Sequence, residues 1–511
     1  MLARIESGAV LGVDAYPVTV EVDLIPGAYL FNVVGLPDVA VKESRVRVRS
    51  ALANSSYPFP SSFQIAVNLA PADMKKEGSA YDLPIALGLL GAMGMLEEVD
   101  FKGYWVLGEL SLDGRVRPTP GVLPVAVEAR KRGCRGLLVA EENASEAAVV
   151  AGLCVLPVRT LAQAVGFFRN EAKIEPRHVD ADALFRQAAA YDTDLQDVRG
   201  QDHVKRAIEV AAAGGHNLLM IGPPGSGKTM LAKRLPSILP DLSFAEALET
   251  TKIYSVAGHL SPEQPLIAIR PFRSPHHTIS DAGLIGGGAV PRPGEISLAH
   301  NGVLFLDELP EFKKQVLEVL RQPLEEGRVT ISRALASITY PARFMLVAAM
   351  NPCPCGYLGH PLHACACTPR QVQMYRSRIS GPLLDRIDLH LEVPAVNYRE
   401  LAAESGGETS EAVRVRVNQA REAQKKRFPD GKVRSNAAMS SRQIRACCAV
   451  DEAGHEMLRN CVDRLGMSAR AHARILKVAR TIADLAGSDR IETVHLAEAI
   501  QYRSLDRATR I

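Results

Sequence analysis

Apolar residues follow two kinds of pattern along the chain. In residues 1–168, short alternating runs such as Gln64–Leu69 predict strands, whereas stretches such as Gly121–Arg132 have helical spacing. Glycine and proline separate these segments, which is typical of an α/β domain. Residues 169–193 are polar and lack a sustained strand pattern, so they predict a linker with some helix.

Two further regions follow this linker. From 194 to 395, apolar strands alternate with helical segments, which predicts a parallel sheet covered by helices on both faces. From 396 to 511 the pattern is helical to the end, with apolar residues at helical spacing at Ile475, Leu476, Val478, Ala479, Ile482 and Leu485. The prediction is a multidomain α/β protein with a C-terminal helical domain.

Length and composition agree with several globular domains. The chain has 511 residues, of which 47% are apolar and 23% charged, so wholesale disorder is excluded. The longest apolar stretch, Leu83–Leu96, is shorter than the ~20 residues of a membrane-spanning helix, so we expect no membrane span. No basic lead into an apolar block is present at the start, and nine cysteines then predict reduced thiols in the cytoplasm.

The net charge is only +3, but basic residues are concentrated in one place. The segment from Val413 to Arg445 contains ten lysines and arginines, and its only acidic residues are Glu422 and Asp430. This stretch is either a solvated helix face with a basic loop or a phosphate-binding surface. The pattern alone does not choose between them.

The strongest chemical signal lies in Asn217–Thr229. An apolar strand leads into the run Gly222, Pro223, Pro224, Gly225, Ser226, Gly227, Lys228 and Thr229, and a helical segment follows. Phosphates need backbone N–H groups at close range, a lysine charge, the positive end of a helix, and a hydroxyl on Mg²⁺. The strand before and the helix after supply the required context, so we predict an ATP and Mg²⁺ site.

Two polar strand ends further along predict the rest of this site. Asp307 and Glu308 end the apolar run Gly302–Leu306, where carboxylates would be costly unless they served a cation or a reaction. We expect Asp307 to hold Mg²⁺ and Glu308 to polarise the attacking water. Asn351 ends a third apolar strand, Phe344–Met350, and can position that water.

With these motifs the sequence resembles the AAA+ ATPases, in the branch of magnesium chelatase and MCM-like helicases. Gly222–Thr229 looks like Walker A, Asp307 and Glu308 like Walker B, and Asn351 like sensor 1. The resemblance implies a P-loop AAA+ core with a parallel αβα sandwich, followed by a helical lid. It also implies an arginine finger at Arg386, within Ser380–Asp388, and a sensor 2 role for Arg470, with Arg474 as its competitor.

The likeness extends beyond generic ATPase motifs. The segments Gly35–Asp38, Pro271–Thr278, Asn351–Gly356 and Leu476–Leu485 are similar to the YifB/ComM family of magnesium-chelatase-like proteins. This family includes a branch-migration helicase of natural transformation. The resemblance implies a homo-oligomeric, hexameric ring that acts on single-stranded or branched DNA.

Residues 1–168 resemble the proteolytic domain of Lon-type proteases, through Gly108–Pro118 and Glu77–Asp82. On that alignment the nucleophilic serine falls on Ala80 and the lysine on about Pro124. Ser79 is one residue away, which is ~100° of rotation on a helix, so its hydroxyl would not serve a Ser–Lys pair. We therefore expect a catalytically dead domain that acts as a scaffold or faces DNA.

Four of the cysteines form a compact group in sequence: Cys353, Cys355, Cys365 and Cys367. Tetrahedral zinc accepts four thiolates, although the C-x-C spacing is tighter than usual. His360 and His363 lie between the pairs as alternative ligands. Structural zinc, an unliganded cysteine-rich loop and redox chemistry all stay open.

Two segments of the ATPase region are candidates for contact with DNA. Leu284–Gly294 has too much glycine and proline for regular structure and predicts a mobile loop, and Glu326–Arg333 with Ser337–Tyr340 predicts a hairpin. In the resembled helicases, elements at these places point into the ring's pore. Arg328 and Arg333 would then track phosphates; alternatively they are hairpin-edge charges that block aggregation.

Two other functions remain open at this stage. A chelatase motor that inserts Mg²⁺ into a porphyrin would need partner subunits, and no porphyrin site is visible in the sequence. A remodelling chaperone would thread polypeptide, for which the glycine-rich insert lacks an aromatic grip. Porphyrin or unfolded protein, rather than DNA, would then stimulate ATP hydrolysis.

Overall fold

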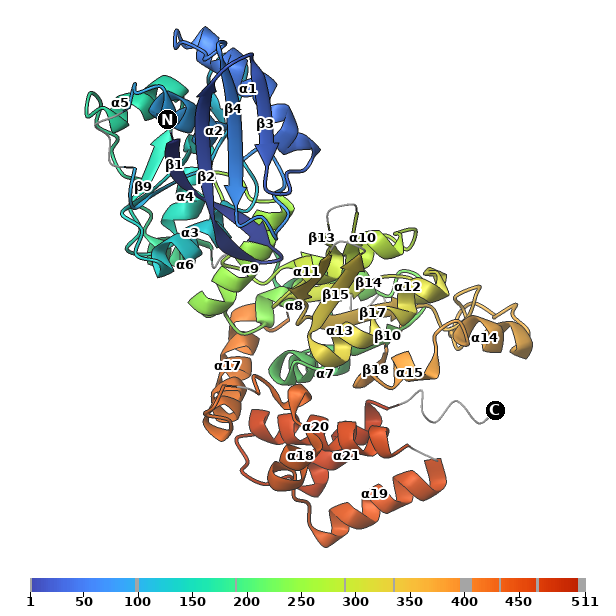
Figure 1. Ribbon diagram of the computed structural model, residues 1–511. Coiled ribbons are helices and arrows are strands. Elements are labelled where there is room, and N and C mark those ends of the chain that lie inside the picture. Colours follow the sequence, from blue (N-terminus) through green and yellow to red (C-terminus); the bar gives the residue numbers. More distant parts are fainter. Residues whose placement is uncertain are drawn as a thin grey trace.

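The computed structural model describes residues 2–96, 101–188, 191–288, 291–333, 336–395, 407–431, 433–465 and 468–503. Three bodies follow one another along the molecule, with the N-terminal sheet at one end and the last helices at the other (Figure 1). None of the helices in those ranges has the length and apolar character that crossing a bilayer requires.

The N-terminal body is built on a mixed seven-stranded sheet. Its strands lie in the order β3 (Leu30–Val34), β4 (Phe63–Ala70), β2 (Asp14–Pro26), β1 (Leu2–Leu11), β5 (Tyr104–Val106), β8 (Gly136–Ala140) and β9 (Val155–Val158). A small ladder joins β6 (Glu109–Leu110) and β7 (Val116–Arg117). The helices are α1 (Val39–Asn54), α2 (Asp82–Ala92), α3 (Val122–Lys131), α4 (Glu141–Ala148) and α5 (Leu161–Phe168).

Alternation along β8 shows why both faces of this sheet are covered. Leu138 and Ala140 join the apolar cluster that contains α1, α2 and α5. Leu137 and Val139 point the other way, into the cluster that contains α3 and α4. A strand buried on both faces reads as a continuous apolar run, and Gly136–Ala140 is buried throughout.

The central body is a five-stranded sheet in the order β11 (Phe272–Arg273), β14 (Val303–Leu306), β17 (Met345–Met350), β10 (Leu218–Ile221) and β18 (Leu389–Glu392). All neighbouring pairs are parallel. Leu218 and Met220 face one apolar cluster, and Leu219 and Ile221 face the other. The parallel sheet covered on both faces, which the sequence predicts, is therefore present.

Short helices and turns complete this body and the segment before it. These are α6 (Ala181–Ala188), η1 (Leu195–Asp197), α7 (Asp202–Gly214), α8 (Lys228–Ile238), α9 (Phe244–Ala257), α11 (Glu295–Leu298), η2 (Leu309–Glu311), α12 (Lys314–Glu318), α13 (Arg321–Glu326), α14 (Pro369–Arg376) and α15 (Gly381–Leu384). Helix α6 lies in the segment for which the sequence predicts a linker with some helix.

The C-terminal body is helical, as the periodicity predicts. It contains α17 (Ser410–Arg427), η3 (Asn436–Ala438), α18 (Ser441–Cys447), α19 (Glu452–Leu465), α20 (Ala469–Leu485) and α21 (Thr493–Gln501). Buried residues of α17 and α20 share one continuous apolar cluster with α7 and α8. We call this body the lid; it covers the α7 face of the central sheet.

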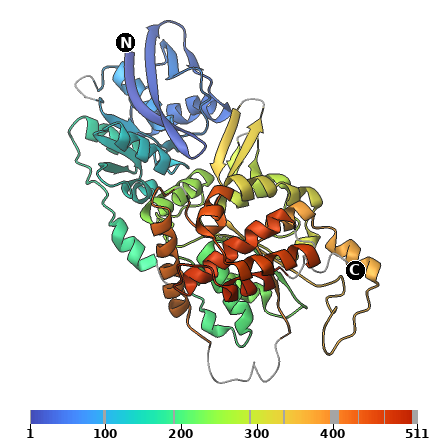
Figure 2. The same ribbon diagram turned by 90° about the horizontal axis from the view of Figure 1, so that it is seen from below.

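Two segments predicted as DNA elements have the following form. The hairpin is confirmed: β15 (Arg328–Arg333) pairs with β16 (Ala336–Pro341) in antiparallel register. It lies beside the N-terminal body (Figure 2), where the turn at Gly12 packs against Ile338. The prediction that Leu284–Gly294 lacks regular structure is wrong in part. Its first two residues belong to α10 (Asp281–Ile285), and β12 (Gly286–Gly287) pairs with β13 (Arg292–Pro293). Gly286 has φ +108°, a conformation that glycine adopts readily and that permits this close pairing.

The N-terminal body is attached to the central body through α9. The backbone N–H of Gly121 donates to the carbonyl of Ser255 at 3.0 Å. The carboxylate of Glu146 is buried between them, accepting from the Ser255 hydroxyl and from the backbone N–H of Leu123 at 2.9 Å. Burial raises the pKa of Glu146. A buried polar network of this kind holds the two bodies in a defined relation.

Candidate functional site

The loop between β10 and α8 has the geometry of a phosphate cradle. Gly227 precedes α8 with φ +85°, a left-handed conformation that favours glycine. Gly222 lies so close to the next strand that a Cβ there would be 2.1 Å from the carbonyl oxygen of Val393. Both positions require glycine, and the loop ends at the N-terminus of α8, where backbone N–H groups and the helix dipole attract anions.

Lys228 turns back onto this loop. Its Nζ donates to the carbonyls of Gly222 at 2.7 Å and Pro223 at 2.9 Å, and it lies 3.4 Å from Oδ1 of Asn351. Burial lowers the pKa of Lys228, and the carboxylate of Asp307 acts in the opposite direction. The ammonium is therefore at the loop, and its partners among the described residues are neutral oxygens that phosphate oxygens can replace.

Thr229 and Asp307 form the candidate Mg²⁺ site. The Thr229 hydroxyl donates to Oδ2 of Asp307 at 2.7 Å, although the residues come from α8 and the end of β14. Neighbouring ligands of octahedral Mg²⁺ lie about 3 Å apart, since each bond is about 2.1 Å. The two oxygens therefore fit as adjacent ligands of this ion.

Glu308 follows directly, in a backbone conformation that is rare for its type. Its φ is +52°, and its side chain is 58% exposed. Such left-handed non-glycine residues cluster at functional sites, because the surrounding structure has to hold them there. The carboxylate is thus accessible to water at the end of β14, directly after Asp307.

His277 also lies at this site. From the sequence, His276 and His277 could lie near the nucleotide or the insert, although an ordinary loop histidine is the simpler interpretation of each. Its Nδ1 lies 3.5 Å from Oε2 of Glu308, and its ring packs edge-on against Phe312. The His276 ring stacks on it at 4.1 Å. β11 lies next to β14 in the sheet, so the residues after β11 reach the edge that carries Glu308. That strand has only two residues, too short for periodicity to reveal.

Arg386 does not lie free on the surface of the single chain. Its guanidinium pairs with Glu325 and donates to the carbonyl of Pro382 at 2.5 Å, and the side chain is 9% exposed. Its buried Nε has no hydrogen-bond partner among the described residues. A role at the nucleotide of a neighbouring subunit therefore requires the pair with Glu325 to open.

The two lid arginines differ in how firmly they are held. Arg474 pairs with Asp388, which is 2% exposed and also accepts from the backbone N–H of Asn217 at 3.0 Å. Burial would raise the pKa of Asp388, but the charge of Arg474 holds it well below the usual range. Arg470 is 65% exposed, and its one ion pair in the described part of the chain is a long contact of 3.7 Å with Asp385. Arg470 is thus the one that can move to a nucleotide at little cost.

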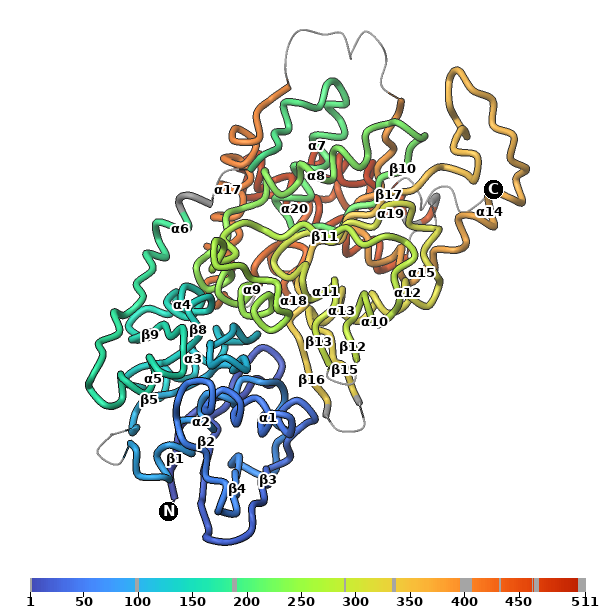
Figure 3. The backbone as a smooth tube through the Cα atoms, turned by 90° about the horizontal axis from the view of Figure 1, so that it is seen from above, coloured from blue at the N-terminus to red at the C-terminus, as the bar shows by residue number. Residues whose placement is uncertain are grey.

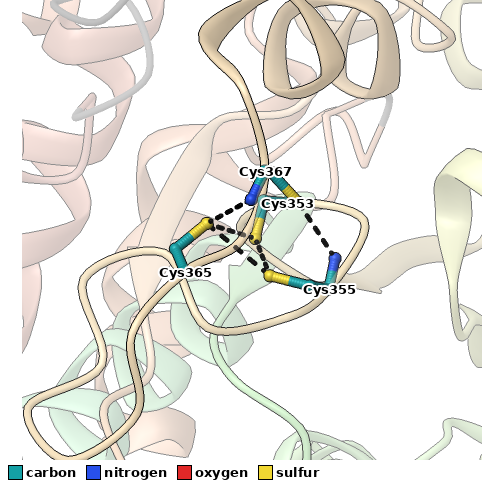
Figure 4. Close-up of side chains that lie close together, drawn as sticks. All are labelled: Cys353, Cys355, Cys365 and Cys367. Carbon is teal, nitrogen blue, oxygen red and sulfur yellow. Dashed lines mark hydrogen bonds between the residues drawn. The ribbon is translucent and has the colours of Figure 1, made fainter.

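The four clustered cysteines come together in space (Figure 4). Sγ of Cys353 lies 3.4 Å from that of Cys355 and 3.6 Å from that of Cys365, and all four ligand atoms are within 4.8 Å of one another. Sulfurs around tetrahedral zinc lie about 3.8 Å apart, because each Zn–S bond is about 2.3 Å. The group therefore fits one metal ion. His360 and His363 pack beside Tyr357 and are not part of it.

The predicted DNA-contacting arginines lie on the hairpin. Arg328 is 62% exposed and pairs with Glu326 at 3.1 Å. Arg333 ends β15, and its side chain lies outside the described part of the structure.

Much of the basic stretch is used internally. Arg416 pairs with Glu209, Arg427 with Asp484, and Arg434 with Glu246, while Arg421 donates to backbone carbonyls. Several of these contacts join the lid to the central body. The exposed members among the described residues are Lys425, Lys426, Arg434, Arg442 and Arg445. At least four arginines of the stretch therefore serve contacts within the chain.

The N-terminal body has apolar contacts where a protease would need its reacting pair. Ala80 packs against the cluster that contains Val122 and Val125 of α3. Ser79 hydrogen-bonds to Glu109 instead of facing a lysine. In the described part of the chain, the Ser79 hydroxyl thus meets a carboxylate and not the lysine that a Ser–Lys pair requires.

Comparison with known families gives matches along most of the chain. Residues 194–401 match the family described as magnesium chelatase, subunit ChlI. Residues 20–143 match the family of subunit ChlI of Mg-chelatase, and residues 407–503 match its C-terminal family.

Several proteins resemble the chain over its whole length. The Escherichia coli protein YifB is 48% identical over 99% of this chain and 98% of its own length. Competence protein ComM of Haemophilus influenzae is 46% identical with the same coverage. The 38 kDa subunit of magnesium chelatase from Rhodobacter capsulatus is 26% identical over 30% of this chain and 48% of its own. With this site and these full-length relatives, the chain belongs to the YifB/ComM family of magnesium-chelatase-like AAA+ ATPases.

Proposed function

We propose that the protein is a ring-forming motor that couples ATP hydrolysis to translocation on DNA, and that it drives branch migration of recombination intermediates. The observation that carries the ATPase part is the convergence of Lys228, Asp307 and Asn351 at one edge of a parallel sheet. The DNA part rests on the family and on a relative that is named a competence protein.

In this proposal the phosphate loop binds the triphosphate through its backbone N–H groups and the N-terminus of α8. Lys228 exchanges the carbonyls of Gly222 and Pro223 for phosphate oxygens. Thr229 and Asp307 hold Mg²⁺, which when bound neutralises charge on the phosphates.

Glu308 accepts the proton of the attacking water, and Asn351 orients that water from the end of β17. Charge that builds up as the phosphoryl group leaves is neutralised by Arg386 of the neighbouring subunit, once its pair with Glu325 has opened. Arg470 contacts the nucleotide from the lid of the same subunit. Hydrolysis then needs a ring, for which we propose a hexamer.

Translocation is assigned to the hairpin and the glycine-rich insert. Arg328 and Arg333 contact phosphates in the central pore, which gives affinity that depends on salt but not on sequence. The hairpin also touches the N-terminal body at Gly12, so its movement reaches that body.

A zinc ion and a cytosolic location complete the proposal. Cys353, Cys355, Cys365 and Cys367 fit four-thiolate zinc by their mutual distances. Free thiols persist in a reducing compartment, which favours the cytosol.

One experiment separates this function from its rivals. We expect the rate of ATP hydrolysis to rise most with forked or four-way DNA, less with single-stranded or duplex DNA, and not with porphyrin or unfolded protein. Lys228→Ala should remove the rate under every condition. Stimulation by porphyrin alone would indicate a chelatase motor, and stimulation by unfolded protein alone a remodelling chaperone; either result overturns the DNA function.

A further inference from the structure

The four thiols lie in the one long connection that starts at the ATP site. Asn351 ends β17, Cys353 follows two residues later, and Cys367 directly precedes Thr368, the N-cap of α14. Between Asn351 and Thr368 the structure has no helix or strand. Figure 3 shows this segment as a loop that projects from the central body beside α14. Long irregular loops in compact domains usually have a function of their own.

This loop packs so closely against the phosphate loop that no side chain would fit at the point of contact. Gly356 has φ +85°, and a Cβ added to it would lie 2.7 Å from Cδ of Pro224. Pro224 is the third residue of the phosphate loop, and Gly356 follows Cys355 directly. The backbone at Gly356, directly after Cys355, therefore packs against the Pro224 ring of the phosphate loop.

The far end of the loop is tied to the catalytic strands as well. Arg376, at the end of α14, reaches back to the carbonyl of Pro352 at 3.4 Å. Arg378 donates to the carbonyl of Pro310 at 3.2 Å and pairs with Glu311 at 2.9 Å, just after Glu308. The segment that begins at the cluster thus contacts the strand ends that carry Asn351 and Glu308.

The thiols supply little to hold the loop in this shape. Cys353 is 0% exposed, and a thiol is only a weak hydrogen-bond donor. The contacts within the group join sulfurs to one another or to the backbone N–H groups of Cys355 and Cys367. A divalent cation bound by four thiolates would replace these weak contacts with strong ones and cross-link both halves of the loop.

We infer that zinc bound by Cys353, Cys355, Cys365 and Cys367 holds Asn351 and the phosphate loop in the arrangement needed for ATP hydrolysis. The metal acts at a distance, through Gly356 and Pro224, and touches no reacting atom. This inference rests on the proposed ATPase function. It predicts that zinc loss lowers the rate of hydrolysis while nucleotide still binds, because Lys228 and the N-terminus of α8 lie outside the loop.

The test compares the full-length wild type with Cys365→Ala, Cys367→Ala and a matched control, Cys154→Ala, which changes a half-buried cysteine in the N-terminal body. Zinc per chain is measured by mass spectrometry, nucleotide affinity with a fluorescent ATP analogue, and turnover by phosphate release. We expect zinc in the wild type and control, no zinc in the two cluster variants, and kcat lower by about tenfold or more with nucleotide affinity retained.

Two further variants keep the inference testable if the alanine variants misfold. Cys365→His keeps a zinc ligand and should retain both zinc and turnover. Gly356→Ala should retain zinc but lower kcat, because its Cβ collides with Pro224. Wild type without zinc after incubation with the metal, or zinc-free variants with unchanged kcat, would overturn the inference. Wild type that binds zinc but hydrolyses no ATP with any DNA would instead overturn the proposed function.

Discussion

Nδ1 of His277 lies 3.5 Å from Oε2 of Glu308, and the two residues come from the ends of adjacent parallel strands. The His277 ring contacts the His276 ring and packs edge-on against Phe312. Four residues further on, Asp281 begins the helix α10 that leads into the glycine-rich insert. His277 is thus positioned between the proposed catalytic base and a proposed DNA element.

We expect His277→Ala to lower kcat because Glu308 loses the contact that orients it. His277→Gln can still hydrogen-bond to a carboxylate and should retain most of the rate. The affinity for ATP should not change in either variant, because the contacts described for His277 are with Glu308, His276 and Phe312. Steady-state kinetics separate these effects, and a normal kcat in His277→Ala would show that the contact is incidental.

Glu308→Gln should reduce ATP turnover about a hundredfold or more, because an amide cannot take the proton of the attacking water. It should still bind ATP, since Lys228 and Thr229 are unchanged. Lys228→Ala should lose both binding and turnover. Equilibrium binding and phosphate release distinguish the two outcomes, and normal hydrolysis by Glu308→Gln would refute the catalytic assignment.

Arg386→Ala should lose about 10³-fold in turnover if the arginine acts on the neighbour's nucleotide. Mixing it with Lys228→Ala should restore part of the rate, since one variant keeps the ATP site and the other keeps the arginine. Glu325→Gln should not be inactive, because it only releases Arg386 from its internal partner. Failure of the mixture to recover any rate would mean that Arg386 serves its own chain.

Asp388→Asn should lower the stability of the lid contact at neutral pH by about 3 kcal/mol, because it leaves Arg474 without its buried partner. The pKa of Asp388 is held below its ordinary 3.8, so the ionised form stabilises the folded state. That contribution is complete above about pH 4 and is lost as the pH falls further.

Thermal unfolding followed across this pH range tests the assignment. Asp385→Asn is the matched control: it removes a 34% exposed carboxylate that lies 3.7 Å from Arg470, and it should change stability by at most about 1 kcal/mol. Equal effects of the two substitutions would contradict the distinction between the two lid arginines.

Arg328→Ala should weaken DNA binding equally for all sequences. It should also reduce the slope of log affinity against log salt concentration by about one. Arg427→Ala should instead destabilise the lid, because the buried Asp484 would lose one of its two arginine partners and keep only Arg480. DNA affinity over a salt series and thermal unfolding check both. A DNA defect in Arg427→Ala without loss of stability would mean that the basic stretch contacts DNA after all.

The contiguous parts of the ATP site are readable in the sequence because their chemistry is local. Gly222–Thr229 is one loop between a strand and a helix, and its glycines are required by backbone geometry within that loop. Asp307 and Asn351 are predictable for a related reason: the carboxyl ends of neighbouring parallel strands meet at one edge. The helical pattern of the lid and the hairpin likewise depend on short-range periodicity and pairing.

Contacts between distant segments are a different matter. His277 follows a strand too short to recognise, and whether Arg386, Arg427 or Arg474 is free or paired depends on a carboxylate supplied by another element. The sequence shows that a residue is charged, but not whether its side chain is solvated or paired with a buried carboxylate. Only the folded chain brings the partner close to it. The same holds for the four thiols, whose spacing permits a metal but whose convergence beside Pro224 is a property of the fold.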